Sequence, residues 1–140
     1  MNQEHIEITS YEGEGYRPVI DYQTWRVAIL NYCEELEVPN LRTMQKHMET
    51  DEVFVLLRGN CVLFAGGTGE DIDLVEAVLM KPLQLYNVKR GVWHTHTLDQ
   101  DGMVLIVENK DTCDDNSPTK PMSEDQIKQL KKLYENVMGS

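Results

Sequence analysis

Two histidines separated by a single residue, His94 and His96, are the most informative chemical feature of the sequence. They lie in a run that favours a β-strand, and residues two apart on a strand project from the same face. His47 and Glu52 form a second group further upstream. If the two segments pair in one barrel, His47, Glu52 and His94 converge on a single pocket. Imidazole and carboxylate side chains bind metal ions and also transfer protons, so the pocket is predicted to be either a metal site or a general acid/base site.

Apolar runs bounded by turn residues predict the strands that carry these side chains. The runs lie at residues 25–32, 52–57, 61–65, 74–80, 83–88, 91–97 and 103–108. The short connection 58–60 contains Gly59 and predicts a hairpin between the second and third runs. Residues 99–102 predict a turn that pairs the last two runs. Before Pro18, the polar and glycine-containing sequence predicts a short strand followed by a loop.

The C-terminal residues change to a helical pattern. Ser123 and Gln126 have the spacing of a capping box, in which each side chain binds the backbone N–H of the other residue. Apolar residues then recur at helical spacing, at positions 127, 130, 133, 134 and 137. We therefore expect a helix at 123–138. The whole chain is predicted to be an all-β barrel or sandwich domain over residues 1–122, with a C-terminal helix within 123–140 packed on it.

Composition excludes several classes of partner. The chain has 140 residues, enough for one domain with its own core, and a formal net charge of −11. This charge opposes binding to nucleic acid and to anionic membrane surfaces. Its three cysteines include no CxxC pair, so a disulfide framework or a thiolate zinc site is not expected. Without a long apolar run, the sequence predicts a cytoplasmic protein that does not enter a membrane.

Two segments have a motif-like spacing. The first contains Gln45, one residue, His47, four residues, Glu52, six residues and a glycine, and the second runs from Lys89 to His94 with a glycine at its third position. Together they resemble the two motifs of the cupin superfamily. Gln45 stands where the first motif has a histidine, and Lys89 stands where the second has a proline. The resemblance implies a cupin-type double-stranded β-helix, also called a jelly-roll barrel.

Residues 45–54 and 92–98 also resemble the segments "ERHP…TQAF" and "VWHHPL" of the ureidoglycolate lyase family, which are small cupins. Two departures are evident. Thr95 separates two histidines that are adjacent in that family, and Glu52 stands where the family tends to have a neutral glutamine. At position 52 the chain is therefore more similar to a metal-binding cupin than to the lyases.

A metal-binding cupin would use His47, Glu52 and His94 as ligands, with Gln45 adding a weak carbonyl oxygen or His96 a third nitrogen. Two imidazoles and one carboxylate suit several divalent metals, so zinc, manganese, iron and nickel all remain open. The neutral amide of Gln45 is a poorer donor than the histidine it replaces.

A ureidoglycolate-type lyase would instead use His94 and His96 as the acid and base, with Glu52 as their partner, to eliminate urea from a carbinolamine carbon. A cationic side chain would then hold the carboxylate of the substrate. The candidates are Arg26, Lys89 and Arg90, which the sequence does not rank.

The function favoured by the sequence is a small-molecule enzyme that resembles ureidoglycolate lyase and acts on a small carboxylate or carbonyl compound. One alternative is a metal-dependent cupin isomerase or oxygenase. Another is a cupin that binds a small ligand without turning it over. A homodimer is expected from the resemblance and from the frequency of twofold symmetry among oligomers.

Overall fold

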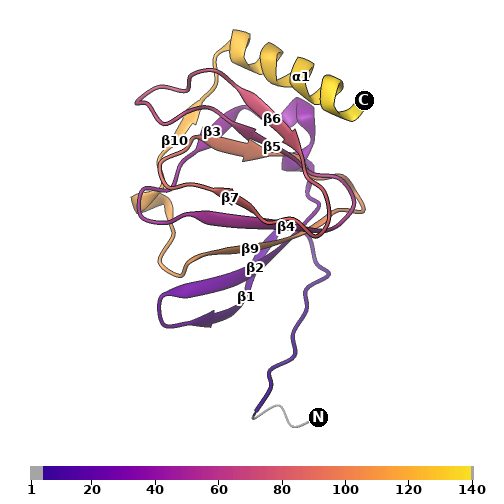
Figure 1. The fold of residues 1–140 in the computed structure, drawn as a ribbon, viewed down its shortest axis with the longest axis vertical. Coiled ribbons are helices and arrows are strands. Elements are labelled where there is room, and N and C mark those ends of the chain that lie inside the picture. The colour runs from indigo at the N-terminus through magenta and orange to yellow at the C-terminus, as the bar shows by residue number, and fades with distance from the viewer. Residues whose placement is uncertain (1–4, 140) are drawn as a thin grey trace.

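The computed structural model describes residues 5–139, which form two five-stranded antiparallel sheets that face each other, with one α-helix outside them (Figure 1). Residues 1–4 and 140, which fall within the predicted ranges 1–122 and 123–140, lie outside the described part. The first sheet contains, in spatial order, β1 (Tyr16–Tyr22), β2 (Trp25–Asn31), β9 (Met103–Asn109), β4 (Glu52–Arg58) and β7 (Tyr86–Val88). The second contains β10 (Thr119–Pro121), β3 (Thr43–Gln45), β8 (His94–His96), β5 (Val62–Ala65) and β6 (Glu76–Leu79). Short 3-10 turns lie in the connections: η1 (Glu34–Leu36), η2 (Val38–Asn40) and η3 (Asp114–Asn116).

The interior between the sheets has an apolar half and a polar half. Three central strands of the first sheet each carry inward apolar residues towards one end and an inward charged residue towards the other. These are Ala28 and Leu30 with Arg26 on β2, Leu56 and Phe54 with Glu52 on β4, and Val104 and Ile106 with Glu108 on β9. Arg26 is paired with Glu108 in the β2–β9 register, so the charged ends lie side by side. The apolar half stabilises the barrel, and the polar half is available for chemistry.

A second core covers the outer face of the second sheet. Helix α1 (Glu124–Gly139) lies outside the second sheet (Figure 1). Its Ile127 and Leu130 belong to one buried cluster with Val62 and Phe64 of β5 and with other buried residues of this sheet and its loops. Because Leu63 points into the barrel and its two neighbours point towards α1, β5 is buried on both faces. This explains why its sequence is apolar without alternation.

The capping box predicted for the helix is confirmed. The Gln126 backbone N–H donates to Ser123 Oγ at 3.1 Å, and the Ser123 N–H donates to Gln126 Oε1 at 2.8 Å. Both orphan donors at the helix start are therefore satisfied, as the motif requires. Within the described residues, no helix combines the length and the apolar character that a membrane crossing needs.

The two predicted strand pairings were wrong. β4 pairs with β7 and β9, whereas β5 pairs with β6 and β8, so residues 59–61 cross from one sheet to the other instead of closing a hairpin. Likewise β8 pairs with β3 and β5, and residues 97–102 cross back to β9. The crossings contact each other, because the Asn60 N–H and side-chain amide both donate to the Asp99 carboxylate. A short glycine-containing connection usually closes a hairpin, but in a jelly roll it can also join two facing sheets.

The sequence also missed or misplaced short strands. β3 and β10 have three residues each and pair with one another, which is too short for a periodic pattern to predict. Pro18 lies inside β1 and not after a loop, at an irregularity in its pairing with β2. β1 lies at the sheet edge, where the missing N–H of a proline is tolerated.

Candidate functional site

The polar half of the barrel interior encloses a cavity of about 410 Å³. Its floor is apolar, with Leu30 and Ile106 continuous with the barrel core. The polar and cysteine residues of its wall come from both sheets and from the segment around η3: Tyr16, Arg26, Cys33, Gln45, His47, Glu52, His94, His96, Glu108, Thr112, Cys113, Asp114 and Ser117. The topology thus brings together residues as far apart in sequence as Tyr16 and Ser117.

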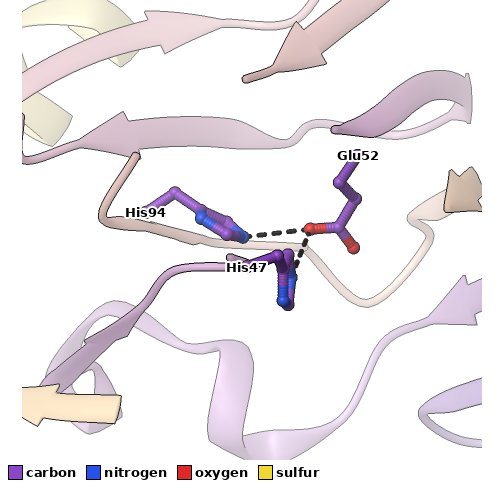
Figure 2. A group of neighbouring side chains, drawn as sticks. All are labelled: His47, Glu52 and His94. Atoms are coloured by element: carbon purple, nitrogen blue, oxygen red, sulfur yellow. Dashed lines mark hydrogen bonds and ion pairs between the residues drawn. The ribbon is translucent and has the colours of Figure 1, made fainter. Parts of the chain in front are cut away.

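His47, Glu52 and His94 converge in this cavity (Figure 2). His47 Nε2 and His94 Nε2 each lie 3.0 Å from the same atom, Glu52 Oε1, and the two rings meet edge to face with centroids 5.0 Å apart. All three residues are buried. His94 comes from β8 and Glu52 from the start of β4, while His47 follows β3, so the barrel must close before the cluster exists.

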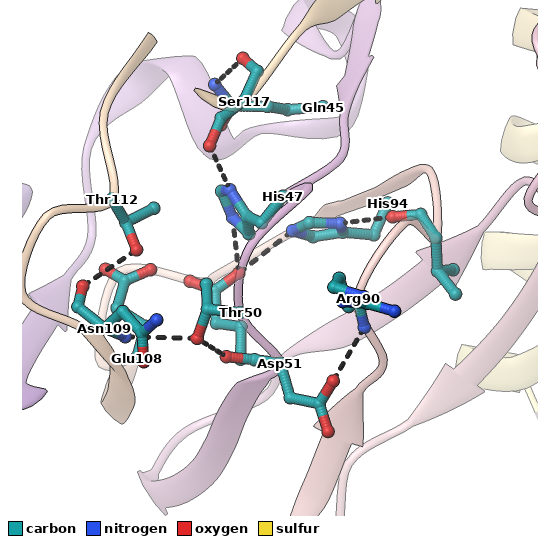
Figure 3. Close-up of polar contacts among 12 residues, drawn as sticks. Gln45, His47, Thr50, Asp51, Arg90, His94, Glu108, Asn109, Thr112 and Ser117 are labelled. Atoms are coloured by element: carbon teal, nitrogen blue, oxygen red, sulfur yellow. Dashed lines mark hydrogen bonds and ion pairs between the residues drawn. The ribbon is translucent and has the colours of Figure 1, made fainter. Parts of the chain in front are cut away.

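Hydrogen bonds behind the two imidazoles determine which ring nitrogens carry protons (Figure 3). His94 Nδ1 lies 2.9 Å from the Val92 carbonyl oxygen, which only accepts, so this nitrogen is protonated. His47 Nδ1 lies 2.7 Å from Ser117 Oγ, whose own proton is donated to Asn116 Oδ1 at 3.0 Å. His47 Nδ1 is therefore also a donor. The Nε2 atoms consequently either share protons with Glu52 or present their lone pairs to a cation.

Burial and hydrogen bonding have opposing effects on these groups. Burial on its own raises the pKa of the Glu52 carboxyl, but the hydrogen bonds from His47 and His94 outweigh it and hold that pKa below its usual range. Burial lowers the pKa of His47, whereas the bond to Glu52 raises it, and the net result is a pKa above the ordinary value. A positive charge at this point is therefore favoured, whether protons or a metal ion supply it.

The donor set fits a divalent metal. One ligand atom from each of His47, Glu52 and His94 lies within 4.8 Å of the others. Two ligands about 2.1 Å from one ion at an angle near 90° are about 3 Å apart, which matches both nitrogen–oxygen distances. The bonds from the Nδ1 atoms to oxygen are also those that orient metal-binding histidines in other proteins. Residues in these positions can hold zinc, manganese, iron or nickel, and the ligand types do not choose among them.

A second cluster lies across the same cavity. Glu108 Oε2 accepts hydrogen bonds from Tyr16 Oη at 2.5 Å, from Arg26 Nη2 at 2.9 Å and from Arg26 Nε at 3.2 Å. Burial and the negative charge of Glu52 raise the pKa of Glu108, and the bonds from Tyr16 and Arg26 reverse this only in part. Burial and Glu108 also raise the pKa of Tyr16, which keeps its hydroxyl protonated. A buried carboxyl with a raised pKa is a candidate proton donor or acceptor.

His96 shares the inward face of β8 with His94 and also lines the cavity, but it does not belong to the metal-binding group. Its ring lies edge-on to Phe54 at a centroid distance of 5.4 Å. Nδ1 is buried and has no hydrogen-bond partner within residues 5–139. Burial lowers the pKa of this imidazole to about 4, so it is neutral at physiological pH. An unpartnered buried nitrogen beside a cavity is suited to contact with a ligand.

The remaining predicted site residues divide into two groups. Gln45 lines the cavity, where its side-chain amide donates to the Ser117 carbonyl oxygen at 3.0 Å. Arg26 also lines it, through the contacts with Glu108. Lys89 and Arg90 are exposed and lie outside this cavity: Lys89 lines a separate groove, and the Arg90 backbone N–H donates to Asp51. Of the three predicted cations, only Arg26 therefore faces the cluster.

Sequence reasoning missed Tyr16, Glu108 and Ser117. Glu108 had a signal, because it follows Val104 and Ile106 on alternate positions and therefore shares their inward face. Ser117 had none, since it lies in an irregular segment whose path depends on β10. Tyr16 lies at the edge strand β1, in the region where the sequence predicted a loop boundary.

No family model matches this chain, and no curated protein matches it. Solved structures do. A cupin-2 domain protein from Shewanella frigidimarina is 13% identical with a TM-score of 0.54, and the match covers 78% of this chain and 100% of that one. Streptomyces PAC13 with uridine is 10% identical with a TM-score of 0.56, over 85% of this chain and 98% of that one. The QdtA 3,4-ketoisomerase from Thermoanaerobacterium thermosaccharolyticum, a double mutant in complex with TDP, is 14% identical with a TM-score of 0.52, over 66% of this chain and 63% of that one. The predicted all-β cupin fold with a C-terminal helix is confirmed.

Proposed function

We propose that this chain is a metal-dependent enzyme that acts on a small molecule by transferring protons inside the barrel. One observation carries the proposal: the Nε2 atoms of His47 and His94 converge on Glu52 while Glu108, a buried carboxyl with a raised pKa, faces the same cavity. A cation site beside an ionisable carboxyl is the pairing that acid/base chemistry next to a carbonyl or hydroxyl group requires.

The residues have separate roles in this proposal. His47, Glu52 and His94 hold the cation, which when bound polarises a carbonyl or hydroxyl oxygen of the substrate. Glu108 accepts a proton from the substrate and returns it to a neighbouring atom or to a leaving group. Tyr16 and Arg26 bind the other side of the Glu108 carboxylate and fix its orientation. Isomerisation returns the proton to the substrate, whereas elimination releases it with the leaving group.

Ureidoglycolate lysis is one reaction of this class, and its support is the resemblance at residues 45–54 and 92–98. It needs a cation for the substrate carboxylate; among the predicted candidates Arg26 lines the cavity, where it is already paired with Glu108. Release of glyoxylate from racemic ureidoglycolate by the metal-loaded protein tests this reaction. Glyoxylate release that is no faster than in buffer, even at high enzyme concentration, would exclude ureidoglycolate lysis as a reaction of this protein.

Metal content tests the proposal directly. Protein purified without chelator is expected to contain about one divalent metal per chain by plasma mass spectrometry, and His47→Ala and His94→Ala should each lose it. His5→Ala is the matched control, since His5 is exposed and lies outside the cavity. Wild-type protein that takes up no metal on titration would contradict the proposal.

The role of Glu108 has its own test. Glu108→Gln should keep the metal, because Glu108 is outside the ligand set, but should lower turnover by about a hundredfold or more, as is usual when a general acid/base is removed. Incorporation of solvent deuterium into a turned-over substrate reports the proton transfer itself. A variant that exchanges deuterium at the wild-type rate would exclude Glu108 from this role.

A further inference from the structure

The hydrogen-bond donors and acceptors of the cavity wall differ in how many are already bound to other groups of the protein. Four of the hydroxyl, imidazole and phenol groups that line it point their protons into the protein. Tyr16 donates to Glu108, Thr112 to the Asn109 carbonyl and Ser117 to Asn116, while His94 donates through Nδ1 to the Val92 carbonyl. The wall therefore offers few free donors to a ligand.

Among residues 5–139, Arg26 is the one arginine or lysine that lines the cavity, and it is also largely engaged. Two of its N–H groups bind Glu108, one binds the Thr112 carbonyl oxygen at 3.1 Å and one binds the Lys110 carbonyl oxygen at 3.0 Å. These bonds occupy four of the five donors of a guanidinium. Its charge is matched by Glu108, with which it forms an ion pair at 2.9 Å. Arg26 consequently lacks both the pair of unoccupied N–H donors and the unpaired charge that bind a carboxylate or phosphate.

Acceptors, by contrast, remain available. Within the described residues, Glu52 Oε2 and Glu108 Oε1 accept no hydrogen bond, because the partners of each carboxyl bind its other oxygen. His96 adds an imidazole whose buried Nδ1 has no partner within the same residues and donates or accepts according to its tautomer. Asp114 places a further, exposed carboxylate at the cavity. An anionic group has only acceptors and would meet these oxygens without donors between them, whereas a hydroxyl group donates to them.

We infer that the cavity takes an uncharged small molecule with several hydroxyl groups, of the monosaccharide or polyol class, and discriminates against carboxylates and phosphates. The inference rests on the proposed function, which it narrows to one class of substrate. The cavity volume of about 410 Å³ is at the lower end of the range of about 300–1,000 Å³ for ligand pockets, which suits a ligand of that size. A bound cation would attract an anionic oxygen more strongly than a hydroxyl oxygen, so the selectivity of the wall itself is read from the protein without metal.

The test compares neutral ligands with anionic relatives that have the same carbon skeleton. Protein-observed NMR titrations of metal-loaded and chelator-treated protein would use the aldopentoses and pentitols, their aldonic acids and their 5-phosphates. At least one neutral compound should shift the His96 and Tyr16 resonances and bind about tenfold or more tightly than its acid and its phosphate, as expected when an anion meets unpaired acceptors. Tighter binding of the acids or phosphates, or binding of no neutral compound, would overturn the inference.

A variant that removes one charge from the cavity wall gives a second comparison of neutral and anionic ligands. Glu108→Gln removes the charge that neutralises Arg26 and should raise the affinity for the anionic compounds by about tenfold or more relative to the neutral ones. Glu12→Gln is the matched control, because it breaks the exposed ion pair with Arg58 and leaves the cavity wall unchanged. An unchanged preference in Glu108→Gln, with the fold intact by circular dichroism, would also overturn the inference.

The results separate this inference from the proposed function. A protein that loads one metal and turns over substrate, but prefers acids, overturns the substrate class alone. A protein that binds neutral polyols but takes up no metal overturns the metal-dependent function, and leaves the selectivity of the cavity wall in place.

Discussion

His47 depends on a residue outside any regular strand for its orientation. Ser117 Oγ accepts from Nδ1 and donates to Asn116, so it holds the ring with Nε2 towards Glu52. Groups that support a metal ligand in this way typically change metal affinity by about 10–100-fold when removed. We therefore predict that Ser117→Ala weakens binding of Zn²⁺ by about that factor, measured by competition with a chromophoric chelator. Ser10→Ala, in an exposed segment, is the control, and equal affinities for the two variants would show that Ser117 does not position the ring.

The charges of His47 and Glu52 predict opposite pH dependences with and without metal. The pKa of Glu52 in the folded protein lies below the ordinary value of 4.5, so its stabilisation is present above pH 4.5 and is lost as the pH falls through the folded pKa. The pKa of His47 in the folded protein lies above the ordinary value of 6.5, so its stabilisation is complete below pH 6.5 and is lost as the pH rises through the folded pKa. In the metal-free protein the pair therefore contributes most to stability between pH 4.5 and pH 6.5.

Between pH 6 and pH 8, the metal-free protein should therefore lose stability relative to His47→Ala, a comparison that cancels the opposite contribution of His96, whose pKa is lowered. The metal-loaded protein should gain stability over the same range, because metal binding competes with protons on the ligands. Urea unfolding at the two pH values, with and without Zn²⁺, measures both trends. Glu52→Gln should flatten the metal-free trend, and a wild-type protein whose two trends have the same sign would contradict the prediction.

The predicted ligands could be found from sequence because they occur in two short motifs, each within one segment. That His47, Glu52 and His94 meet could not be derived from either segment alone. Arg26 and Glu108 form a cross-strand pair between β2 and β9, so the residues of this pair are 82 positions apart and only the sheet register joins them. Nothing local distinguishes Arg26 from the exposed Lys89 and Arg90, and this is why the sequence could not rank the three cations.

At the scale of elements, α1 was predictable because its signals are local: capping residues and apolar positions lie within a few turns of one another. The strands were predictable as segments and not as pairs. Strand pairing is a long-range property, and the two short glycine-containing connections have the appearance of hairpins although both cross between sheets. The apolar run of β5 gave no face preference, because α1 buries the second face.

The crossing at Gly59 is predicted to be sensitive to any side chain. Gly59 has a φ of +76°, and a Cβ atom there would lie 2.6 Å from the Gly102 Cα of the other crossing. Gly59→Ala should lower the free energy of unfolding by more than the cost of about 1–2 kcal/mol for a positive φ alone, measured by urea denaturation. Gly15→Ala is the matched control, since Gly15 has a φ of +78° but nothing within 4 Å of the added carbon. Equal losses in the two variants would show that the close contact between the crossings has no energetic effect.

At the scale of the whole molecule, the core beneath α1 contributes to stability but lies on the opposite face of the second sheet from the cavity. Leu130 of α1 is fully buried against the outer face of the second sheet, whereas the cavity lies on the inner face. Leu130→Ala should destabilise the protein by about 2–5 kcal/mol, as is usual for a large-to-small change in a core. The affinity of the folded protein for metal should remain within about twofold of wild type, because the ligands come from the other face.

Thermal unfolding with parallel metal titration measures both quantities for Leu130→Ala. Leu85→Ala, at a residue 74% exposed, is the control and should change neither. A large loss of metal affinity in folded Leu130→Ala would mean that packing in the outer core affects the positions of His47, Glu52 and His94.

The charged ends of β2, β4 and β9 also constrain how the chain assembles. A slip of one residue turns each inward charge outwards, and a slip of two moves Arg26 or Glu108 opposite the apolar positions of the neighbouring strand. In either case a buried charge loses its partner, which is costly. Only one alignment of β2 with β9 keeps Arg26 beside Glu108, and a slip of β4 would move Glu52 away from His47 and His94. The same side chains that make the cavity reactive therefore discriminate against misaligned barrels, and replacing them with apolar residues would make the barrel more tolerant of strand slippage even where it made the barrel more stable.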